Sequence, residues 1–126
     1  MGISCDSKYS HYSWSKTSLK KGGIGELNYP LLSDIDCSVA KKYGVLLGDD
    51  KHPCRATFLI DPKLKIRHIS MNDPPVGRNI NELLRLVEAY QFTDENGEVC
   101  PVNWHKGDNT IKEDPVEKLE YFENIN

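Results

Sequence analysis

The most informative stretch of this chain is Gly97-Glu98-Val99-Cys100-Pro101. It stands just beyond an amphipathic, helix-like segment and inside a polar tail, where few apolar side chains are available to surround a thiol. Cysteines that serve packing are usually buried. The position therefore indicates that Cys100 has a chemical role, and the alternative is an unused surface cysteine.

Outward from this stretch, further short motifs follow one another along the chain. They are Asp6-Ser7, Gly22-Gly23-Ile24-Gly25, Pro30-Leu31-Leu32-Ser33-Asp34, Arg55 before Thr57-Phe58-Leu59-Ile60-Asp61, Asn72-Asp73 before Pro75-Val76-Gly77-Arg78, Trp104 with Lys106-Gly107, and Tyr121-Phe122. In order and spacing these motifs resemble the typical two-cysteine peroxiredoxins (thioredoxin peroxidases), whose resolving cysteine stands in a Val-Cys-Pro tripeptide. The resemblance covers nearly the whole chain.

The resemblance implies an α/β, thioredoxin-like (peroxiredoxin) fold that is N-terminally truncated and carries a C-terminal arm and helix. The family attacks peroxide with a cysteine in a Pro-x-x-x-Thr/Ser-x-x-Cys motif, and none of Cys5, Cys37, Cys54 and Cys100 stands in one. We therefore expect the C-terminal portion of a peroxiredoxin. Residues 1–92 would form a partial thioredoxin-like domain, and residues 93–126 an arm with the resolving cysteine.

The resemblance also implies a function. It indicates a thiol-dependent peroxidase that reduces hydrogen peroxide and alkyl hydroperoxides with thioredoxin as reductant, without metal, haem or flavin, in antioxidant defence and redox homeostasis. This chain would carry the resolving cysteine but not the peroxidatic one, so by itself it is expected to be inactive. The alternative function is a non-catalytic assembly module, or a holdase that uses an exposed apolar face.

Three residues are candidates for the catalytic site: Cys100, Arg55 and Arg78. A guanidinium at the start of a strand can donate two hydrogen bonds toward a thiolate and a peroxide oxygen, and the resemblance gives Arg55 that role. The alternative is a solvated arginine at a strand end. Arg78 matches a second arginine of the family, although it could instead serve only the local turn.

The composition limits the classes of partner that we expect this protein to bind. The 126 residues include 16 basic and 19 acidic side chains, interspersed, for a net charge of −3. No basic stripe exists to neutralise a row of phosphates, so we expect no nucleic acid. No apolar run approaches the roughly 20 residues of a membrane-spanning helix, and the start lacks a secretory pattern. A cytoplasmic protein without a membrane partner is expected.

The remaining cysteines are interpreted as structural. No Cys-x-x-Cys pair occurs, and His52 with Cys54 is the single close His/Cys pair, so a metal site is not expected. Cys5 and Cys37 are expected to be small apolar fillers. For Cys54, packing is preferred over a redox role.

Local patterns predict the elements. Ile3 to Cys5 ends a buried strand, and Ser7 caps a helix that runs toward Lys16. Its aromatic residues Tyr9, Tyr12 and Trp14 are expected to fill the core, and the alternative is a stacking platform for a ligand. Further elements are a strand at residues 30–32, a helix at 37–43 capped by Asp36, a hairpin of residues 57–61 and 65–71, a helix that begins with a capping box at Asn79 and Glu82, an extended arm over 93–113, and a last helix capped by Asp114.

The second hairpin strand, Lys65 to Met71, is expected to be a sheet edge. In the family this strand pairs with its copy to form a homodimer, and such dimers assemble into a decamer. The strand contains Ile66 and Ile69 and no proline, which suits edge pairing. Because an α/β sheet is normally covered on both faces, we also expect apolar sheet surface to be open to solvent.

Overall fold

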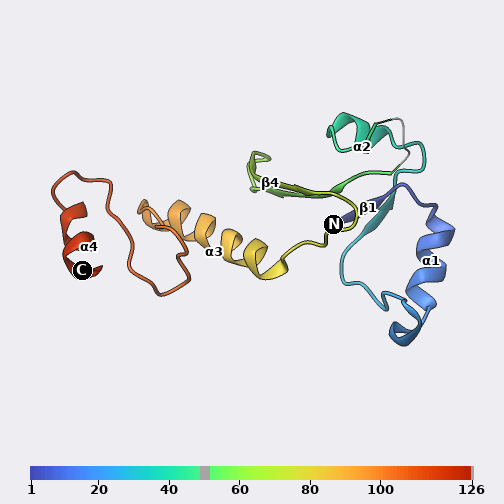
Figure 1. Cartoon of the computed structure of the whole chain (residues 1–126), viewed down its shortest axis with the longest axis horizontal. Coiled ribbons are helices and arrows are strands. Elements are labelled where there is room, and N and C mark those ends of the chain that lie inside the picture. The colour runs from blue at the N-terminus through green and yellow to red at the C-terminus, as the bar shows by residue number, and fades with distance from the viewer. Residues whose placement is uncertain (49–51, 126) are drawn as a thin grey trace. The chain divides into compact units, whose positions relative to one another are not determined.

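The computed structural model describes residues 1–48 and 52–125. These residues fold into two compact units, which are described separately. The first unit comprises Met1–Thr57 and Ile69–Gly77, and the second comprises Phe58–His68 and Arg78–Asn126. The chain contains both helices and short strands, as predicted for an α/β protein, and a β-hairpin stands between two of the helices along the chain (Figure 1).

The first unit begins with a β-α-β crossover. Strand β1 (Gly2–Ser4) pairs in parallel with β2 (Leu31–Ser33), and Ser4 stands opposite Ser33. Helix α1 (Lys8–Lys16) and the 3-10 turn η1 (Leu19–Lys21) form the connection. The predicted strands are confirmed, but the expectation that the first is buried is wrong, because Ile3 is 45% exposed.

Helix α1 is capped as predicted: the hydroxyl of Ser7 accepts a hydrogen bond from the backbone N–H of Ser10 at 3.1 Å. The prediction that its aromatic residues fill the core is wrong, since Tyr9, Tyr12 and Trp14 are all exposed. The buried side chain of the helix is His11, whose Nε2 lies 2.6 Å from the hydroxyl of Ser4. A polar contact therefore holds the inner face of α1 where an apolar one was expected.

The glycine-rich loop after η1 is a close approach of two backbone segments. A Cβ atom placed on Gly23 would lie 1.8 Å from the carbonyl oxygen of Thr17. The N–H of Gly23 donates to the carbonyl of Ser18, and the indole N–H of Trp14 donates to the carbonyl of Gly22 at 2.7 Å. Only glycine fits at position 23, and the loop is tied to α1 on both sides.

Helix α2 (Ser38–Lys42) is capped differently from the prediction. Asp36 accepts one hydrogen bond, from the N–H of Ser38, but the main acceptor is the buried carboxylate of Asp34. Asp34 takes the N–H groups of Val39 at 3.0 Å and Ala40 at 2.8 Å. Asp34 therefore satisfies donors of the first helical turn that would otherwise be unpaired and buried. The buried apolar residues of this unit are Cys37, Ala40 and Val45.

The predicted hairpin is confirmed as β3 (Arg55–Ile60) and β4 (Ile66–Asn72), which form a two-stranded sheet. Its turn is organised by Asp61, whose carboxylate accepts from the N–H groups of Lys63 and Lys65, both at 2.9 Å. The residues near the turn belong to the second unit and the remaining residues of both strands to the first.

The second unit is built on helix α3 (Ile80–Asn96). The side chain of Asn79 caps it by accepting from the N–H of Glu82, as predicted, but the Glu82 carboxylate turns to Arg85 and leaves the capping box half formed. The helix ends at Gly97, which has a left-handed backbone (φ 69°). The predicted arm therefore begins about four residues too early, because this C-cap lies beyond residue 93.

Helix α4 (Lys118–Ile125) follows a turn capped by Asp114, whose carboxylate accepts from the N–H groups of Val116 and Glu117.

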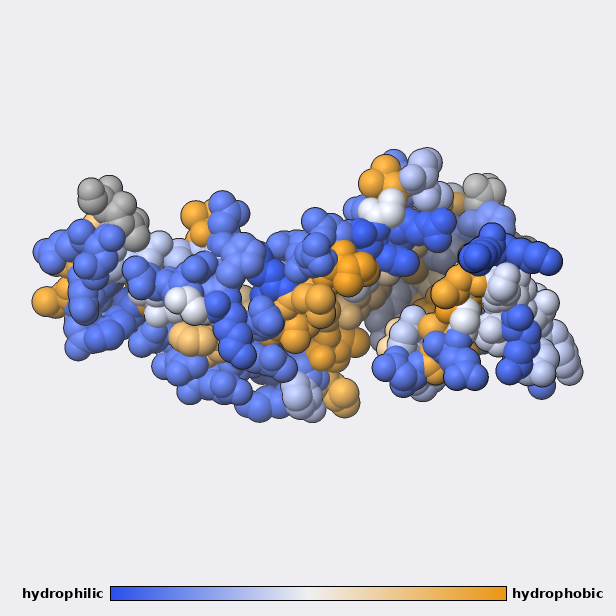
Figure 2. Space-filling view, turned by 90° about the horizontal axis from the view of Figure 1, so that it is seen from below, coloured by the Kyte–Doolittle hydropathy of each residue, from blue (hydrophilic) through white to orange (hydrophobic). Residues whose placement is uncertain are grey.

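Large apolar side chains are exposed on both sheets, in agreement with the expected open surface. Examples are Ile3, Leu32, Ile66 and Ile69. Figure 2 shows such apolar surface as orange patches between hydrophilic areas. Among the described residues, no helix has the length and apolarity needed to cross a bilayer.

Candidate thiol site

The segment after α3 is a closed loop rather than the extended arm that was predicted. Val99 and Ile111 form an antiparallel bridge, with N–H to carbonyl distances of 2.8 and 2.9 Å. Cys100 is the first residue inside the loop that this bridge closes. The thiol therefore stands beside a fixed backbone point.

Trp104 forms the centre of the loop. It is only 2% exposed, and its ring lies 5.1 Å from that of Phe92 on α3, centroid to centroid. Its indole N–H donates to the carbonyl of Asp108 at 3.1 Å, and its backbone N–H donates to that of Pro101. A buried indole with its polar atom satisfied supplies a large apolar contact. The polar segment can therefore adopt one conformation.

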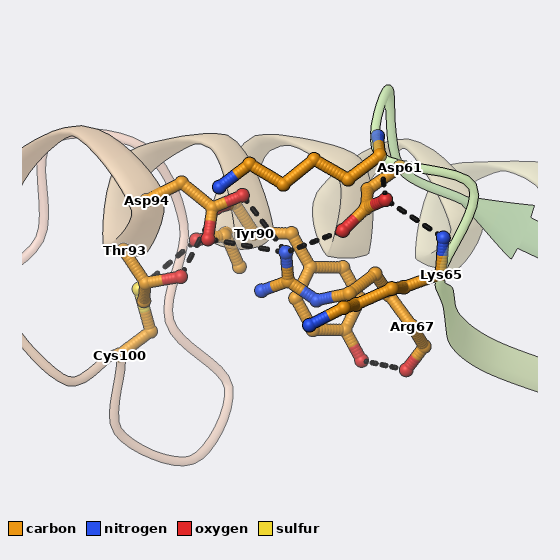
Figure 3. Close-up of polar contacts among 9 residues, drawn as sticks. Asp61, Lys65, Arg67, Tyr90, Thr93, Asp94 and Cys100 are labelled. Atoms are coloured by element: carbon orange, nitrogen blue, oxygen red, sulfur yellow. Dashed lines mark hydrogen bonds and ion pairs between the residues drawn. The ribbon is translucent and has the colours of Figure 1, made fainter.

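Cys100 itself is half-buried against α3. Its thiol donates a weak hydrogen bond to the carbonyl of Ala89, with 3.8 Å between sulfur and oxygen (Figure 3). Burial raises the pKa of this thiol, and the positive charge of Arg85 opposes the effect. In this position the sulfur is a protonated thiol, which is a weak nucleophile.

Arg85 joins helix and loop. Its guanidinium pairs with both oxygens of Glu82 at 2.7 Å and donates to the carbonyl of Trp104 at 3.1 Å. The hydrogen bond with Glu82 raises the pKa of Arg85. Sequence reasoning missed this residue. Its i, i+3 spacing from Glu82 was a signal for the ion pair, but nothing local pointed to Trp104.

The last turns of α3 are fixed to the turn end of the hairpin (Figure 3). Arg67 donates to both carboxylate oxygens of Asp94, at 2.8 and 3.1 Å, and lies 3.6 Å from Asp61. Its guanidinium also lies over the ring of Tyr90, whose hydroxyl donates to the carbonyl of Arg67 at 2.8 Å. These contacts hold the part of the helix that carries the Ala89 acceptor of Cys100.

The two candidate arginines stand at the start of β3 and just before the cap of α3. Arg55 is the first residue of β3, is exposed, and donates from Nε to the carbonyl of Pro74 at 3.2 Å. Arg78 is exposed one residue before the cap of α3. Arg55 belongs to the first unit, whereas Arg78 and Cys100 belong to the second. The three candidates are therefore divided between the two units, and their assembly into one site stays a prediction.

Cys54 is half-buried, and its N–H donates to the carbonyl of Val45. Cys37 is buried, as expected of an apolar filler, and Cys5 is partly buried. Within residues 1–48 and 52–125, no group of three or more His, Cys, Asp or Glu side chains is arranged to hold a metal ion.

Comparison with known proteins identifies the family. The AhpC/TSA family matches residues 1–69, and the C-terminal domain of 1-Cys peroxiredoxin matches residues 89–124. The chain is a peroxiredoxin of the AhpC/TSA family. Over all 126 residues it is 48% identical to Peroxiredoxin-4 of Bos taurus and to a thioredoxin peroxidase of Trypanosoma brucei rhodesiense, and it spans 46% and 63% of their lengths.

Solved structures agree with this assignment. The reduced 2-Cys peroxiredoxin of Plasmodium vivax is 43% identical and superposes with a TM-score of 0.89 over 97% of this peroxiredoxin chain and 63% of its own. The yeast mitochondrial 1-Cys peroxiredoxin is 31% identical, with a TM-score of 0.75 over 88% of the chain and 56% of its own. The predicted family and the thioredoxin-like α/β fold are confirmed.

Proposed function

We propose that this peroxiredoxin takes part in thiol-dependent reduction of hydrogen peroxide and alkyl hydroperoxides, with Cys100 as the resolving thiol and thioredoxin as the reductant. The observation that carries the proposal is the position of Cys100, at the mouth of a closed loop and held by one weak hydrogen bond to Ala89. A similar chain, from Trypanosoma brucei rhodesiense, is named a thioredoxin peroxidase.

The chemistry assigned to Cys100 is the second half of a two-thiol cycle. An attacking thiolate takes one oxygen from the peroxide and becomes a sulfenic acid. The Cys100 sulfur then displaces that oxygen as water, and a disulfide forms. A protonated resting thiol suits this order, because Cys100 has no need to react with peroxide itself. The weak bond to Ala89 is lost when the sulfur leaves.

Arg55 and Arg78 are proposed to serve the attacking cysteine. A guanidinium lowers the pKa of a neighbouring thiol and stabilises charge that develops on a peroxide oxygen. The hydrogen bond from Nε of Arg55 to Pro74 leaves the two terminal nitrogens of the guanidinium as donors. That arrangement would allow bidentate recognition of sulfur and peroxide.

The decisive experiment couples peroxide consumption to a thioredoxin system. None of the four cysteines stands in the family's attacking motif, so the chain alone is expected to show no turnover. A fusion to the segment of Peroxiredoxin-4 that contains the motif is expected to turn over. In the fusion, Cys100→Ser should stop the cycle at the sulfenic acid, whereas Cys54→Ser should leave it running. Robust turnover by the chain alone, as fast as that of the fusion and lost in Cys54→Ser or Cys37→Ser, would overturn the proposal.

The proposed assembly is a homodimer through the edge of β4, with further assembly into a decamer. The exposed side chains of Ile66, Ile69 and Met71 along this strand support it. Ile69→Pro removes a backbone donor and should give a monomer in light scattering, while Ile69→Val should remain dimeric. A dimer that survives the proline would place the interface elsewhere.

We also propose that the protein acts in the cytoplasm. Solved relatives include a mitochondrial 2-Cys peroxiredoxin of Plasmodium falciparum, so the compartment is tested by imaging the tagged protein.

The exposed apolar surface favours one other function, a non-catalytic holdase or assembly module. Suppression of the aggregation of a heat-denatured client by the chain, without any peroxide turnover by the fusion, would favour that function.

A further inference from the structure

Two cysteines outside the proposed resolving site lie at one edge of the β1–β2 sheet. Cys5 directly follows the last residue of β1, and the parallel register sets Ser4 opposite Ser33 at the end of β2. The N–H of Asp34 donates to the carbonyl of Ser4 at 2.8 Å and continues the pairing beyond the strands. The carboxyl ends of both strands are therefore joined at this point.

A tight turn then brings Cys37 back to this edge. Its N–H donates to the carbonyl of Asp34 at 2.8 Å, and its backbone is left-handed, with φ 57°. This places the side chains of Cys5 and Cys37 as neighbours, and Cys37 contributes to the raised pKa of Cys5. Cys37 is 5% exposed and Cys5 is partly buried. Neighbouring thiols need only small side-chain movements to reach the geometry of a disulfide.

We propose that Cys5 and Cys37 are a second redox pair, which closes to an intramolecular disulfide when the protein is exposed to a hydroperoxide. One thiol attacks the peroxide, breaks the O–O bond and becomes a sulfenic acid, and an alcohol or water leaves. The other thiol attacks that sulfur and displaces the oxygen as water. Two electrons pass from the two thiols to one peroxide, and both thiol protons end in the products.

The surroundings of Cys5 and Cys37 make their oxidation by peroxide slow. Burial and the contact with Cys37 raise the pKa of Cys5 to about 12, and the carboxylates of Asp34 and Asp6 act in the same direction. Thiolate is scarce at neutral pH, so the pair responds to sustained peroxide and not within each catalytic turnover. The proposal goes beyond the function assigned to Cys100 and does not depend on it.

Closure would fix the end of β1 to the start of α2. The disulfide would enclose the crossover helix α1 and the glycine-rich loop in one covalent ring. A ring of this size stabilises the folded state by restricting the unfolded chain. The oxidised protein is therefore expected to melt at least about 5 °C above the reduced protein.

The test is a peptide map of the full chain. The native protein is incubated with hydrogen peroxide, its remaining thiols are alkylated in denaturant, and it is digested with trypsin without reduction. We expect a linked species of peptides 1–8 and 22–41, lighter by two hydrogen atoms than their sum and separated by dithiothreitol. The wild-type map alone decides whether the pair closes.

Variants assign the link. Cys54→Ser and Cys100→Ser are expected to retain it, and Cys5→Ser to remove it together with the rise in melting temperature; circular dichroism checks that each variant folds. The proposal is overturned if peroxide converts Cys5 or Cys37 to sulfinic acid without the link. It is equally overturned if their peptides are found linked only to Cys54 or Cys100.

Discussion

The loop around Trp104 and the turn around Asp34 hold their cysteines by opposite means. In the loop, a buried aromatic ring organises a polar segment, and Cys100 stays half-exposed beside it. In the turn, a buried carboxylate collects backbone N–H groups, and Cys37 is enclosed. The first region has a buried aromatic contact at its centre, and the second has a buried carboxylate that accepts backbone N–H groups.

The two kinds of restraint allow different movements of the two thiols. A loop held by apolar burial can open, because its freed backbone groups are hydrated as it leaves the helix. Opening the Asp34 turn would leave buried N–H groups without an acceptor, which costs more than the hydrogen bonds alone contribute. This agrees with the proposed roles, in which Cys100 moves to a partner cysteine and Cys37 reacts with the neighbouring Cys5.

The largest expected effect comes from removing the aromatic centre of the loop. Trp104→Ala should lower the free energy of unfolding by about 3–5 kcal/mol, the usual cost of deleting a buried aromatic side chain. Urea denaturation followed by circular dichroism measures it, and Cys100 should be alkylated faster in the variant. Trp104→Phe, which keeps a ring against Phe92, is the matched control and should lose less. Equal alkylation rates in Trp104→Ala and wild type would show that the loop does not restrain the thiol.

The next effect concerns the carboxylate of the turn. Asp34→Ala leaves the N–H groups of Val39 and Ala40 without their acceptor, and should cost about 2–4 kcal/mol at roughly 1–2 kcal/mol for each group. Hydrogen exchange at these two amides should accelerate together with global destabilisation. Asp36→Ala, at the exposed neighbouring cap, should cost clearly less. If the two variants lose the same stability, the buried carboxylate is not what holds the turn.

A smaller effect is expected where the hairpin supports the helix below the Cys100 loop. Tyr90→Phe deletes the hydroxyl that donates to the carbonyl of Arg67 and keeps the ring beneath the guanidinium, so the loss should be on the order of 1 kcal/mol. Chemical denaturation measures it. Tyr9→Phe, on an exposed face of α1, should change nothing. An unchanged Tyr90→Phe protein would contradict a supporting role for this bond.

The smallest effect is the response of the contact between Arg67 and Asp94 to pH. The hydrogen bond from Arg67 lowers the pKa of Asp94 below its ordinary 3.8. The unfolded state therefore binds its proton first, so the stabilisation is complete above about pH 4 and is lost as the pH falls below that value. Asp94→Asn should flatten the profile of stability against pH between about pH 5 and about pH 2. Added salt should reduce the difference from wild type. A variant profile parallel to that of wild type would rule out this linkage.

Much of the fold was readable from short-range patterns. The caps at Ser7, Asn79 and Asp114 were predicted because each acceptor lies two or three residues before its donor. Asp34 escaped the same reasoning, since its carboxylate reaches donors five and six residues ahead across an intervening turn. The aromatic residues of α1 were misplaced because a buried His11 with a polar partner occupies the inward face.

In the candidate site, too, short-range features could be predicted and long-range contacts could not. Cys100 could be singled out because its neighbours in sequence carry the signal. The restraints on it could not, since Arg85 meets Trp104 across 19 positions and Arg67 meets Asp94 across 27. Contacts of that separation depend on the whole unit folding. The roles of Arg55 and Arg78 remain predictions, because they rest on the family resemblance.

The close approach at Gly23 also limits how this protein can change. A library that varies residues 22–25 and is screened for folded protein should return glycine at position 23 almost without exception, because a methyl group there meets the Thr17 carbonyl oxygen. Gly22 has open space around it and a left-handed backbone, so asparagine or aspartate should also be recovered there. Two adjacent glycines that look alike in the sequence therefore tolerate substitution very differently, one limited by space and the other only by its backbone angle.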